Sequence, residues 1–453
     1  MSEDGAIAEL LARARRLAAR AEDEAAKSAY LDLLRRDPTH SAALNELGAL
    51  AYASGHRSAA RTAYEQAVRH HPNDALGRVN LGNMLREDGD LAAARDHFAA
   101  ALAADPDCAE AHQGIARVFA ELGDDRAAAP HWEKGFAGRA LVTRRYRGPA
   151  PGVPILLLVS AKGGNIPTRH LLDDRVFAVS ALYAEFHDPA EPLPPHVLVF
   201  NAIGDADLCA EGLARAEDLL RRTAAPVVNP PALVATTGRA ANARRLAGIP
   251  RAVVPTIRAV PRAALAAAGD LRFPLLLRSP GFHTGRHFVA VERREDLAAA
   301  AAQLPRDEVL AIDYLDARGS DGMARKYRVM IVDKVLYPLH LAISADWKVH
   351  YFTAAMAANA AYREHERRFL GDMPAVLGSD AMAALERIGG VLGLDYAGVD
   401  FALAPDGSLL LFEANPAMVV NPPEPEPIWD YRRAPIARVL DAVQRMILAR
   451  AGR

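Results

Sequence analysis

The sequence predicts an N-terminal all-α repeat array followed by a domain of mixed α/β and α+β character. Three observations support this fold class. Residues of the same type recur every 34 positions through the first third of the chain. A segment rich in proline and glycine, "YRGPAPGVP" at 146–154, ends that pattern and reads as a linker. Beyond it, short apolar runs alternate with amphipathic stretches, which is typical of βαβ units.

Four residue types recur at the same positions of the 34-residue period, and we call these positions the repeat anchors. They are Pro38, Pro72 and Pro106; Gly55, Gly89 and Gly123; Ala60, Ala94 and Ala128; and Tyr64, Phe98 and Trp132, with Tyr30 one step earlier. A generic helical bundle would not keep four anchors in register. The pattern resembles the tetratricopeptide repeat, in which a small alanine lets two helices approach and an aromatic side chain fills the neighbouring groove. We therefore expect three repeats over about residues 40–140, preceded by a weaker helical pair from Ile7 to Arg36. Such solenoids offer a concave face to peptides or proteins, although self-association or packing is an alternative role.

Composition narrows the classes of function. The chain has 453 residues, 51% of them hydrophobic and 24% charged, as expected for a soluble protein of two or three domains. A net charge of −2 gives no reason to expect nucleic acid or an anionic membrane as a partner. Cys108 and Cys209 are the only cysteines, which argues against a disulfide scaffold and suits a reducing cytoplasm. The start, "MSEDGAIAEL", lacks the order of a signal peptide, and the most apolar run is too short to cross a bilayer.

The segment after the linker reads as a small parallel α/β unit. "VPILLLVSA" near residue 155 and "HVLVFNAIGD" at 196–205 predict buried strands. The residues at 211–223 predict an amphipathic helix, and "APVVNPP" predicts a short strand after it. The turn "AKGGN" has neither the spacing of a P-loop nor a dinucleotide fingerprint, so it does not indicate a phosphate site.

The stretch "YAGVDFALAPDGSLLLFEANPAM" predicts a β-hairpin with three oxygen-bearing side chains on one face. A two-residue turn at Asp406 and Gly407 would place Asp400 directly opposite Glu413. Asn415 lies two positions after Glu413 and therefore projects on the same side of its strand. Two carboxylates and an amide at one patch suit Mg²⁺, completed by nucleotide phosphates. The alternative is the polar side of a half-buried hairpin, which the apolar flanks "VDFAL" and "LLLFEANP" disfavour.

An acid on one strand, a turn and then "FEANP" resemble the metal-binding hairpin of the ATP-grasp ligases, and the resemblance extends over about residues 150–450. Other segments follow the order of that family. The residues at 227–259 resemble the exit from its first lobe, and those at 273–292 resemble the strands and glycine loop that cover the phosphates. The residues at 309–317 resemble the strand that holds adenine, and those at 324–340 resemble the strand pair that carries a phosphate- or substrate-binding arginine.

The resemblance implies ATP and Mg²⁺ as cofactors, and it implies a set of site residues. The nucleotide contacts would be Arg239, Arg278, Gly281, His283, Gly285, Asp313, Tyr314, Leu315, Asp316 and Lys326; the metal ligands Asp400, Glu413 and Asn415; and the groups acting in the reaction Arg328, Arg278, His340 and Lys348. Glycines in the phosphate loop let backbone amides approach phosphate oxygens. Either of the two aspartates in the adenine segment could reach the ribose hydroxyls. His283 and His287 are not in an HExxH pattern, so zinc is not indicated.

Three positions depart from the family pattern. Arg239 and Arg278 stand where the family usually has lysine, and a guanidinium is larger and flatter than an ammonium. Lys326 stands where an acid is common. These departures favour an inactive descendant that still binds nucleotide, whereas the intact set of two acids and an amide favours an active enzyme.

The expected domain organisation is a repeat domain at 1–142, a linker at 143–153, an α/β lobe at 154–235, and nucleotide-binding and catalytic lobes at 236–453. The resemblance implies an ADP-forming ligase that joins a carboxylate to an amine through an acyl phosphate, and the low cysteine content favours a cytoplasmic location. Its repeats would recruit a peptide or protein substrate, or a protein partner, and small-molecule carboxylates and amines are further substrate candidates. The alternatives are an inactive nucleotide-binding scaffold whose repeats mediate interaction and, last, a glycosyltransferase preceded by repeats.

Overall fold

The computed structural model of the chain describes residues 3–20, 22–282, 285–351 and 354–453. The chain forms two compact units, Met1–Arg139 and Ala140–Arg453. The boundary lies before residue 142, where the repeat pattern placed it, because the short strand β1 (Leu141–Thr143) pairs with a strand of the second unit. The first unit is called the helical unit below, and the second is called the sheet unit.

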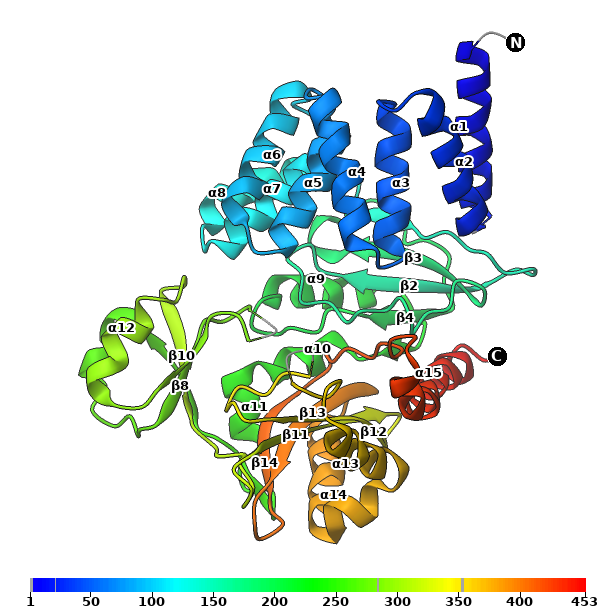
Figure 1. Ribbon diagram of the computed structural model, residues 1–453. Helices are drawn as coiled ribbons and strands as arrows, with labels where there is room; N and C mark the ends of the chain where they lie inside the picture. The colour runs from blue at the N-terminus through cyan, green and yellow to red at the C-terminus, as the bar shows by residue number, and fades with distance from the viewer. Residues whose placement is uncertain (1–2, 21, 283–284, 352–353) are drawn as a thin grey trace. The chain divides into compact units, whose positions relative to one another are not determined.

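The helical unit is built from antiparallel helix pairs that stack side by side, drawn from blue to cyan in Figure 1. The pairs are α1 (Glu3–Ala19) with α2 (Asp23–Arg36), α3 (Ser41–Ala53) with α4 (Arg57–His70), α5 (Ala75–Glu87) with α6 (Leu91–Ala104), and α7 (Ala109–Glu121) with α8 (Asp125–Phe136). The predicted three repeats and the helical pair before them are confirmed.

The repeat anchors have the structural roles that their residue types predict. Gly55, Gly89 and Gly123 have φ angles of 84°, 88° and 86°, a left-handed conformation that only glycine adopts readily in these turns. The repeat alanines and aromatic residues are buried. A Cβ added to Gly48 would lie 2.5 Å from Cε1 of Tyr64, so the aromatic ring occupies the space that the missing side chain leaves. The 34-residue period therefore encodes the packing of neighbouring helices.

The first sheet of the sheet unit is the predicted parallel α/β element. Its strand order is β1-β3-β2-β4-β5, with β2 (Val153–Val159), β3 (Phe177–Tyr183), β4 (Leu198–Asn201) and β5 (Val227–Val228). These four strands are parallel to their neighbours, and β1 is antiparallel to β3. The accompanying helices are α9 (Ala210–Leu220), α10 (Pro231–Val234) and the 3-10 helices η1 (Ala184–Phe186) and η2 (Ala235–Thr237). The predicted strands and helix are confirmed, while β1 and β3 were not predicted.

The second sheet is a small antiparallel lobe with a core of its own. Its strand order is β7-β10-β8-β9, with β7 (Ile257–Pro261), β8 (Leu275–Arg278), β9 (Phe288–Val291) and β10 (Glu308–Asp313). It is accompanied by α12 (Leu297–Ala301), η3 (Arg262–Ala267) and η4 (Arg294–Asp296).

The third sheet carries the candidate site. Its strand order is β12-β11-β13-β14-β6, with β6 (Ala252–Val253), β11 (Ala324–Val332), β12 (Val335–Ser344), β13 (Tyr396–Leu403) and β14 (Leu409–Asn415). The elements around it are α11 (Arg239–Leu246), α13 (Ala360–Gly371), α14 (Met373–Leu392), η5 (Pro427–Trp429) and α15 (Asp430–Arg450).

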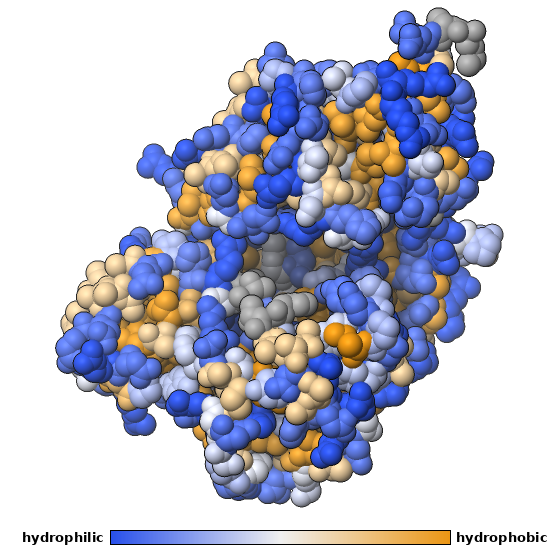
Figure 2. Space-filling model, viewed as in Figure 1, coloured by the Kyte–Doolittle hydropathy of each residue, from blue (hydrophilic) through white to orange (hydrophobic). Residues whose placement is uncertain are grey.

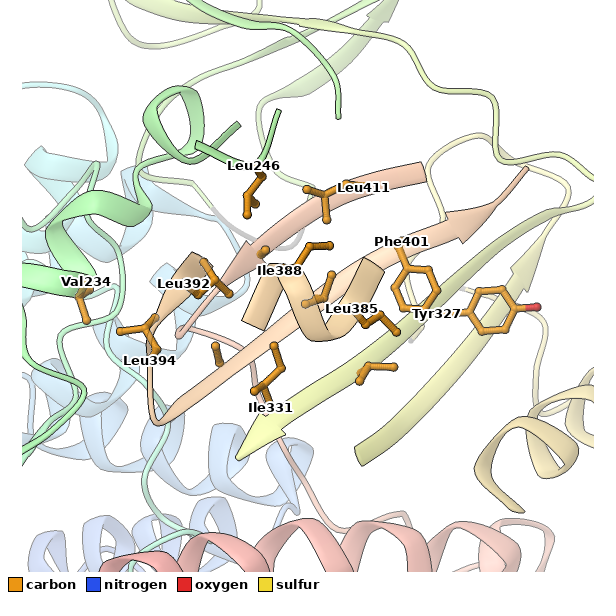
Figure 3. Packing of buried hydrophobic residues seen from close by; sticks show 14 of the residues in the cluster. Val234, Leu246, Tyr327, Ile331, Leu385, Ile388, Leu392, Leu394, Phe401 and Leu411 are labelled. Carbon is orange, nitrogen blue, oxygen red and sulfur yellow. The ribbon is translucent and has the colours of Figure 1, made fainter. Parts of the chain in front are cut away.

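One face of this third sheet is packed with hydrophobic side chains. Figure 3 shows Leu385 and Ile388 of α14 next to Ile331, Phe401 and Leu411 of the sheet. Because successive residues of a strand point to opposite faces, the residues between these positions point to the other face of the sheet. That other face carries the polar side chains described below.

Figure 2 shows mostly hydrophilic residues on the visible surface, with hydrophobic side chains scattered among them. Among the helices of the described residues, none is long and apolar enough to span a membrane.

Candidate functional site

Four polar side chains form a row of directly paired positions across the third sheet. His340 of β12 pairs with Arg328 of β11. Arg328 pairs with Asp400 of β13, which in turn pairs with Glu413 of β14. Strands lie about 4.8 Å apart, so each member of the row is within side-chain reach of the next. The predicted opposition of Asp400 and Glu413 is confirmed.

The turn and the register that bring Asp400 opposite Glu413 differ from the prediction. Near the turn, Leu403 pairs with Leu409, and the N–H of Ala404 donates to the carbonyl of Ser408 at 2.8 Å. The turn therefore has three residues between its last bonded pair, and the predicted two-residue turn is wrong. A bulge at Phe412 restores the register by one residue. Without this bulge the pleat would place the Glu413 side chain on the face that packs against α14.

A second bulge lies beside the row on β12. Arg328 pairs with His340 while the next residue, Val329, pairs with Pro338. Proline has no N–H to give to a sheet, so it is found at edges and bulges. Both bulges are next to the row, and each one sets the face to which a polar side chain points.

Asp400 is the electrostatic centre of the row. It is 3% exposed, and its carboxylate accepts from Arg328 Nε at 2.5 Å and from Arg328 Nη2 at 2.8 Å. Lys326 Nζ lies 3.2 Å from Asp400 Oδ2. Burial alone would raise the pKa of the Asp400 carboxyl, but Arg328 and Lys326 lower it well below its usual value. Asp400 is therefore ionised at neutral pH.

Glu413 and Asn415 lie on the same side of β14, as predicted. Asn415 Nδ2 donates to Glu413 Oε1 at 2.6 Å, and Arg239 Nη2 lies 2.6 Å from the same oxygen. Within the described residues, no group of three or more His, Cys, Asp or Glu is arranged to hold a metal ion. The candidate metal donors are thus two carboxylates and one amide, and both carboxylates pair with cationic side chains in this structure.

Arg278 is a buried cation with unused donor capacity. It lies at the end of β8, and its guanidinium carbon is 5.4 Å from the ring centre of Phe288. One of its terminal nitrogens donates to the carbonyl of Phe282, while Nε is buried without a hydrogen-bond partner among the described residues. Burial and the neighbouring charge of Arg239 lower the pKa of Arg278 to about 10. A guanidinium that is costly to bury and incompletely bonded favours an anionic ligand.

These groups line one cavity of the sheet unit with a volume of about 650 Å³. The predicted site residues in its lining are Arg239, Arg278, Gly285, Asp313, Tyr314, Leu315, Lys326, Arg328, His340, Lys348, Asp400, Glu413 and Asn415. They come from segments up to about 180 residues apart, from α11 to the end of β14. The volume is in the range of sites for cofactors and drug-sized ligands.

Three predicted residues are not among those that line the cavity. Asp316 forms an ion pair with Arg318 at 2.8 Å, and this pairing lowers the pKa of its carboxyl. Gly281 has a φ of 78° and lies against Leu208. The third residue, His283, lies outside the described residues.

Gly285 has a backbone conformation that favours glycine. Its φ is 73°, and a Cβ there would lie 2.4 Å from Cε of Lys348. The Lys348 ammonium lies 3.5 Å from the carbonyl of Phe288, so this lysine touches both the glycine segment and β9. Burial and the charge of Arg278 lower the pKa of Lys348.

His340 is buried in the row and is neutral at neutral pH. Burial, together with the charge of Arg328, lowers the pKa of its imidazole well below the usual value. Its Nδ1 is buried and has no hydrogen-bond partner in the part of the chain that the structure describes. A neutral imidazole carries one N–H donor and one acceptor nitrogen, and His340 lines the cavity.

Sequence reasoning missed several residues that line the cavity. They are Phe288, Trp347, His350, Tyr351, Trp429 and Arg432. Most of them lie in loops or at the start of α15, where no periodic pattern marks the direction of a side chain.

Comparison with known proteins identifies the repeats. A family model described as Tetratricopeptide repeat matches residues 46–107 and 80–140. No curated protein matches the chain.

Among solved structures, a RimK domain protein ATP-grasp from Sphaerobacter thermophilus is 21% identical, with a TM-score of 0.42 over 66% of this chain and 100% of that chain. MamA 41-end from Desulfovibrio magneticus RS-1 is 23% identical, with a TM-score of 0.26 over 29% of this chain and 73% of that chain. A tetratricopeptide repeat protein from Parabacteroides merdae is 19% identical, with a TM-score of 0.26 over 29% of this chain and 52% of that chain. The helical unit thus contains tetratricopeptide repeats, and the role of the sheet unit is inferred from its own residues.

Proposed function

We propose that the sheet unit binds Mg-ATP in its cavity and catalyses the ADP-forming ligation of a carboxylate to an amine. The observation that carries this proposal is the row His340, Arg328, Asp400 and Glu413, which places a neutral imidazole, a cation and two carboxylates side by side in the lining of the cavity. A structural ion-pair network could also be buried in a sheet. The cavity at this row and the incompletely bonded Arg278 favour a ligand site.

The cationic residues fit a polyphosphate. Arg239, Arg278 and Lys326 line the cavity together and lie on three different elements. Arg278 lines the cavity, and the one hydrogen bond of its guanidinium among the described residues goes to the carbonyl of Phe282, so further N–H groups of the guanidinium can serve a phosphate oxygen. Arginine at the two positions where lysine is usual in the similar family gives forked contacts in place of point charges.

The acidic residues fit a divalent cation of the Mg²⁺ type. Asp400 and Glu413 supply carboxylate oxygens, and Asn415 supplies an amide oxygen, which are the hard donors that Mg²⁺ prefers. In the present structure the same carboxylates are neutralised by Arg328, Lys326 and Arg239. Asp400, Glu413 and Asn415 would hold the Mg²⁺ of bound Mg-ATP, which would supply charge neutralisation at the transferring phosphoryl group, and Arg328, Lys326 and Arg239 would then be available to phosphate oxygens.

The nucleoside end of the ligand fits the other side of the cavity. Tyr314 and Leu315 follow directly after β10 and line the cavity with Leu276 and Ile312. Asp313 is the candidate for the ribose hydroxyls, because Asp316 is held by Arg318.

The reaction has two steps. A carboxylate oxygen of the donor substrate attacks the γ-phosphorus of ATP, the bond to the bridging oxygen breaks, and ADP leaves. The amine nitrogen of the acceptor then attacks the acyl phosphate, and inorganic phosphate leaves. Arg278, Arg328 and Lys348 stabilise the charge that develops on the oxygens, and neutral His340 positions a substrate group by hydrogen bonding.

The helical unit would recruit a protein or peptide, as tetratricopeptide repeats commonly offer a groove to such partners. A second candidate function is a nucleotide-binding scaffold without catalysis. The observation that favours it is the pairing of both candidate metal carboxylates with cations. Phosphate release from ATP, screened with pools of amino acids and peptides, separates the two: substrate-dependent release supports the ligase, and bound ATP without release supports the scaffold.

Calorimetric titration of Mg-ATP tests the nucleotide site. Glu413→Ala should abolish measurable metal-dependent binding, because it removes one of two acids that face the triphosphate. Glu386→Ala is the matched control, since Glu386 is an exposed acid on α14 and does not line the cavity. If Glu413→Ala binds Mg-ATP with the affinity of the unmodified protein, the site is assigned wrongly.

A further inference from the structure

The cavity holds a cation that the phosphate and metal contacts leave unused. Arg432, in the first turn of α15, lines the cavity and is 9% exposed. Its guanidinium carbon lies 4.3 Å from the ring centre of Tyr351 and 5.9 Å from that of Trp429. A guanidinium held against aromatic rings has a fixed plane, so its N–H groups point in fixed directions.

Glu366 of α13 holds this guanidinium from one side. Its carboxyl is completely buried and accepts from Tyr431 Oη at 2.5 Å, from Tyr351 Oη at 3.3 Å and from the N–H of Leu341 at 3.3 Å. Arg432 Nε lies 3.4 Å from Glu366 Oε1, which is an ion pair but not a hydrogen bond. Burial raises the pKa of Glu366, and Arg432 opposes that rise. The acid is thus satisfied mainly by the two tyrosines and the backbone.

The terminal nitrogens of Arg432 are the unused donors. Within the residues that the structure describes, no hydrogen bond from any Arg432 nitrogen is found, and Nε alone among them is completely buried. The two terminal nitrogens therefore keep accessible surface in the residue's small exposed fraction. Because Arg432 lines the cavity, these nitrogens are the donors that it can offer to a ligand there.

The surroundings of Arg432 differ from those of the phosphate contacts. Tyr351, Trp429 and Met356 give this part of the cavity an aromatic and apolar wall. Glu366 balances the charge of Arg432, so the pair suits a ligand with a single negative charge better than a polyphosphate. His340, whose ring centre is 4.8 Å from that of Tyr351, connects this region to the row of paired residues.

We propose that Arg432, backed by Glu366 and flanked by Tyr351 and Trp429, binds a carboxylate of the substrate that does not react. Two parallel N–H groups of a guanidinium match the two oxygens of a carboxylate. The ligand is an amine acceptor that carries its own carboxylate: a free amino acid or the C-terminus of a peptide. This inference rests on the proposed ligase function, because it identifies the substrate class of the same cavity.

The experiment compares acids with their amides. Binding of the twenty standard amino acids, of a set of dipeptides, and of the C-terminal carboxamide of each is measured by thermal shift and calorimetry, with and without Mg-ADP. We expect at least one acid to bind about tenfold or more tightly than its amide, as for loss of a charge-assisted hydrogen bond. If a free amino acid binds, the ligand is a free amino acid. If dipeptides bind and free amino acids do not, the ligand is the C-terminus of a peptide.

Variants connect that preference to Arg432. Arg432→Lys keeps the charge without the fork and should reduce the preference for the acid. The double variant Arg432→Gln with Glu366→Gln should abolish it, and it leaves no unpaired charge in the core that could prevent folding. Arg445→Gln is the control, because Arg445 is exposed on the same helix and does not line the cavity.

Equal binding of every acid and its amide, or an acid preference that survives in the double variant, would overturn the proposed subsite. Mg-ATP binding is titrated on the same protein samples. If the protein binds Mg-ATP but binds each acid and its amide equally, the Arg432 subsite is rejected and the proposed nucleotide site is not. Absence of Mg-ATP binding in the unmodified protein rejects the proposed function, whereas the acid–amide comparison without nucleotide still tests Arg432.

Discussion

The two faces of the third sheet use the same strands for opposite purposes. On one face, Ile331, Phe401 and Leu411 pack against α14, and all of these side chains are buried and apolar (Figure 3). On the other face, Asp400 is the neighbour of Phe401 in β13 and is as well buried, whereas Arg328, which pairs with Asp400 from β11, is partly buried. Burial alone therefore does not separate a core from a site.

The difference lies in what burial costs. Removing apolar surface from water stabilises the fold by roughly 25 cal/mol per Å², so the apolar face contributes wherever it is well packed. Removing charges from water is unfavourable, and pairing them offsets this cost only in part. The polar face is thus retained at a cost to stability, which is the usual sign that its charges serve a ligand.

The largest effect should follow from breaking the polar face. Asp400→Asn leaves Arg328 and Lys326 near a neutral amide, so we expect the free energy of unfolding to fall by about 3–5 kcal/mol. Urea unfolding measures the loss. Adding Arg328→Met to the Asn variant should recover part of it, because one orphaned charge is then removed. A loss below about 1 kcal/mol for Asp400→Asn would mean that the pair contributes little.

The same pair gives a pH dependence with a defined sign. The folded-state pKa of Asp400 is lowered, so its contribution to stability is present above the unfolded-state pKa of about 4 and is lost as the pH falls toward the folded value. We expect the unmodified protein to lose stability below about pH 4 by more than Asp400→Asn does. Urea unfolding of both proteins at pH 7 and at pH 3.5 makes the comparison, and parallel losses would contradict it.

The apolar face should respond differently. Leu385→Ala removes a completely buried side chain from α14 and should lower the free energy of unfolding by about 2–5 kcal/mol, through lost burial and a cavity. Mg-ATP affinity should not change at temperatures where the variant is folded, because Leu385 lies on the face away from the polar row. A variant that is stable yet binds Mg-ATP ten times more weakly would show that the two faces are coupled.

The sequence predicted the helical unit almost completely. Each helix pair there packs mainly against its neighbours, so the anchors Gly55, Ala60 and Tyr64 report a local geometry that recurs along the chain. In the sheet unit, the parallel strands were also predictable from apolar runs, whereas the predicted Asp400–Glu413 pair is correct only because the bulge at Phe412 compensates for the wrongly predicted turn.

What could not be predicted depends on contacts between distant segments. The bulge at Phe412 corrects a register that the turn alone sets wrongly, and nothing local marks it. The pairing of Asp316 with Arg318, which removes Asp316 as a cavity residue, depends on loop conformation. Arg432 enters the cavity because α15 packs on strands about a hundred residues earlier, and no motif surrounds it.

The smallest effect is expected from removing the helical unit. Both faces of the third sheet, the cavity and every candidate contact to Mg-ATP lie within Ala140–Arg453. A protein that starts at Ala140 keeps β1, which pairs with β3, and should fold and bind Mg-ATP within about twofold of the affinity of the full chain. A start at Val153 removes β1 and exposes an edge of the first sheet, so it is the matched comparison for folding. Ligation of a large substrate by the shortened protein should weaken mainly through a higher KM, because the repeats would add binding that is equal in the ground and transition states.

Circular dichroism measures whether the shortened protein folds, and calorimetric titration measures its affinity for Mg-ATP. Loss of Mg-ATP binding in a folded protein that starts at Ala140 would mean that the repeats complete the nucleotide site, and the assignment of recruitment to the helical unit would then fail.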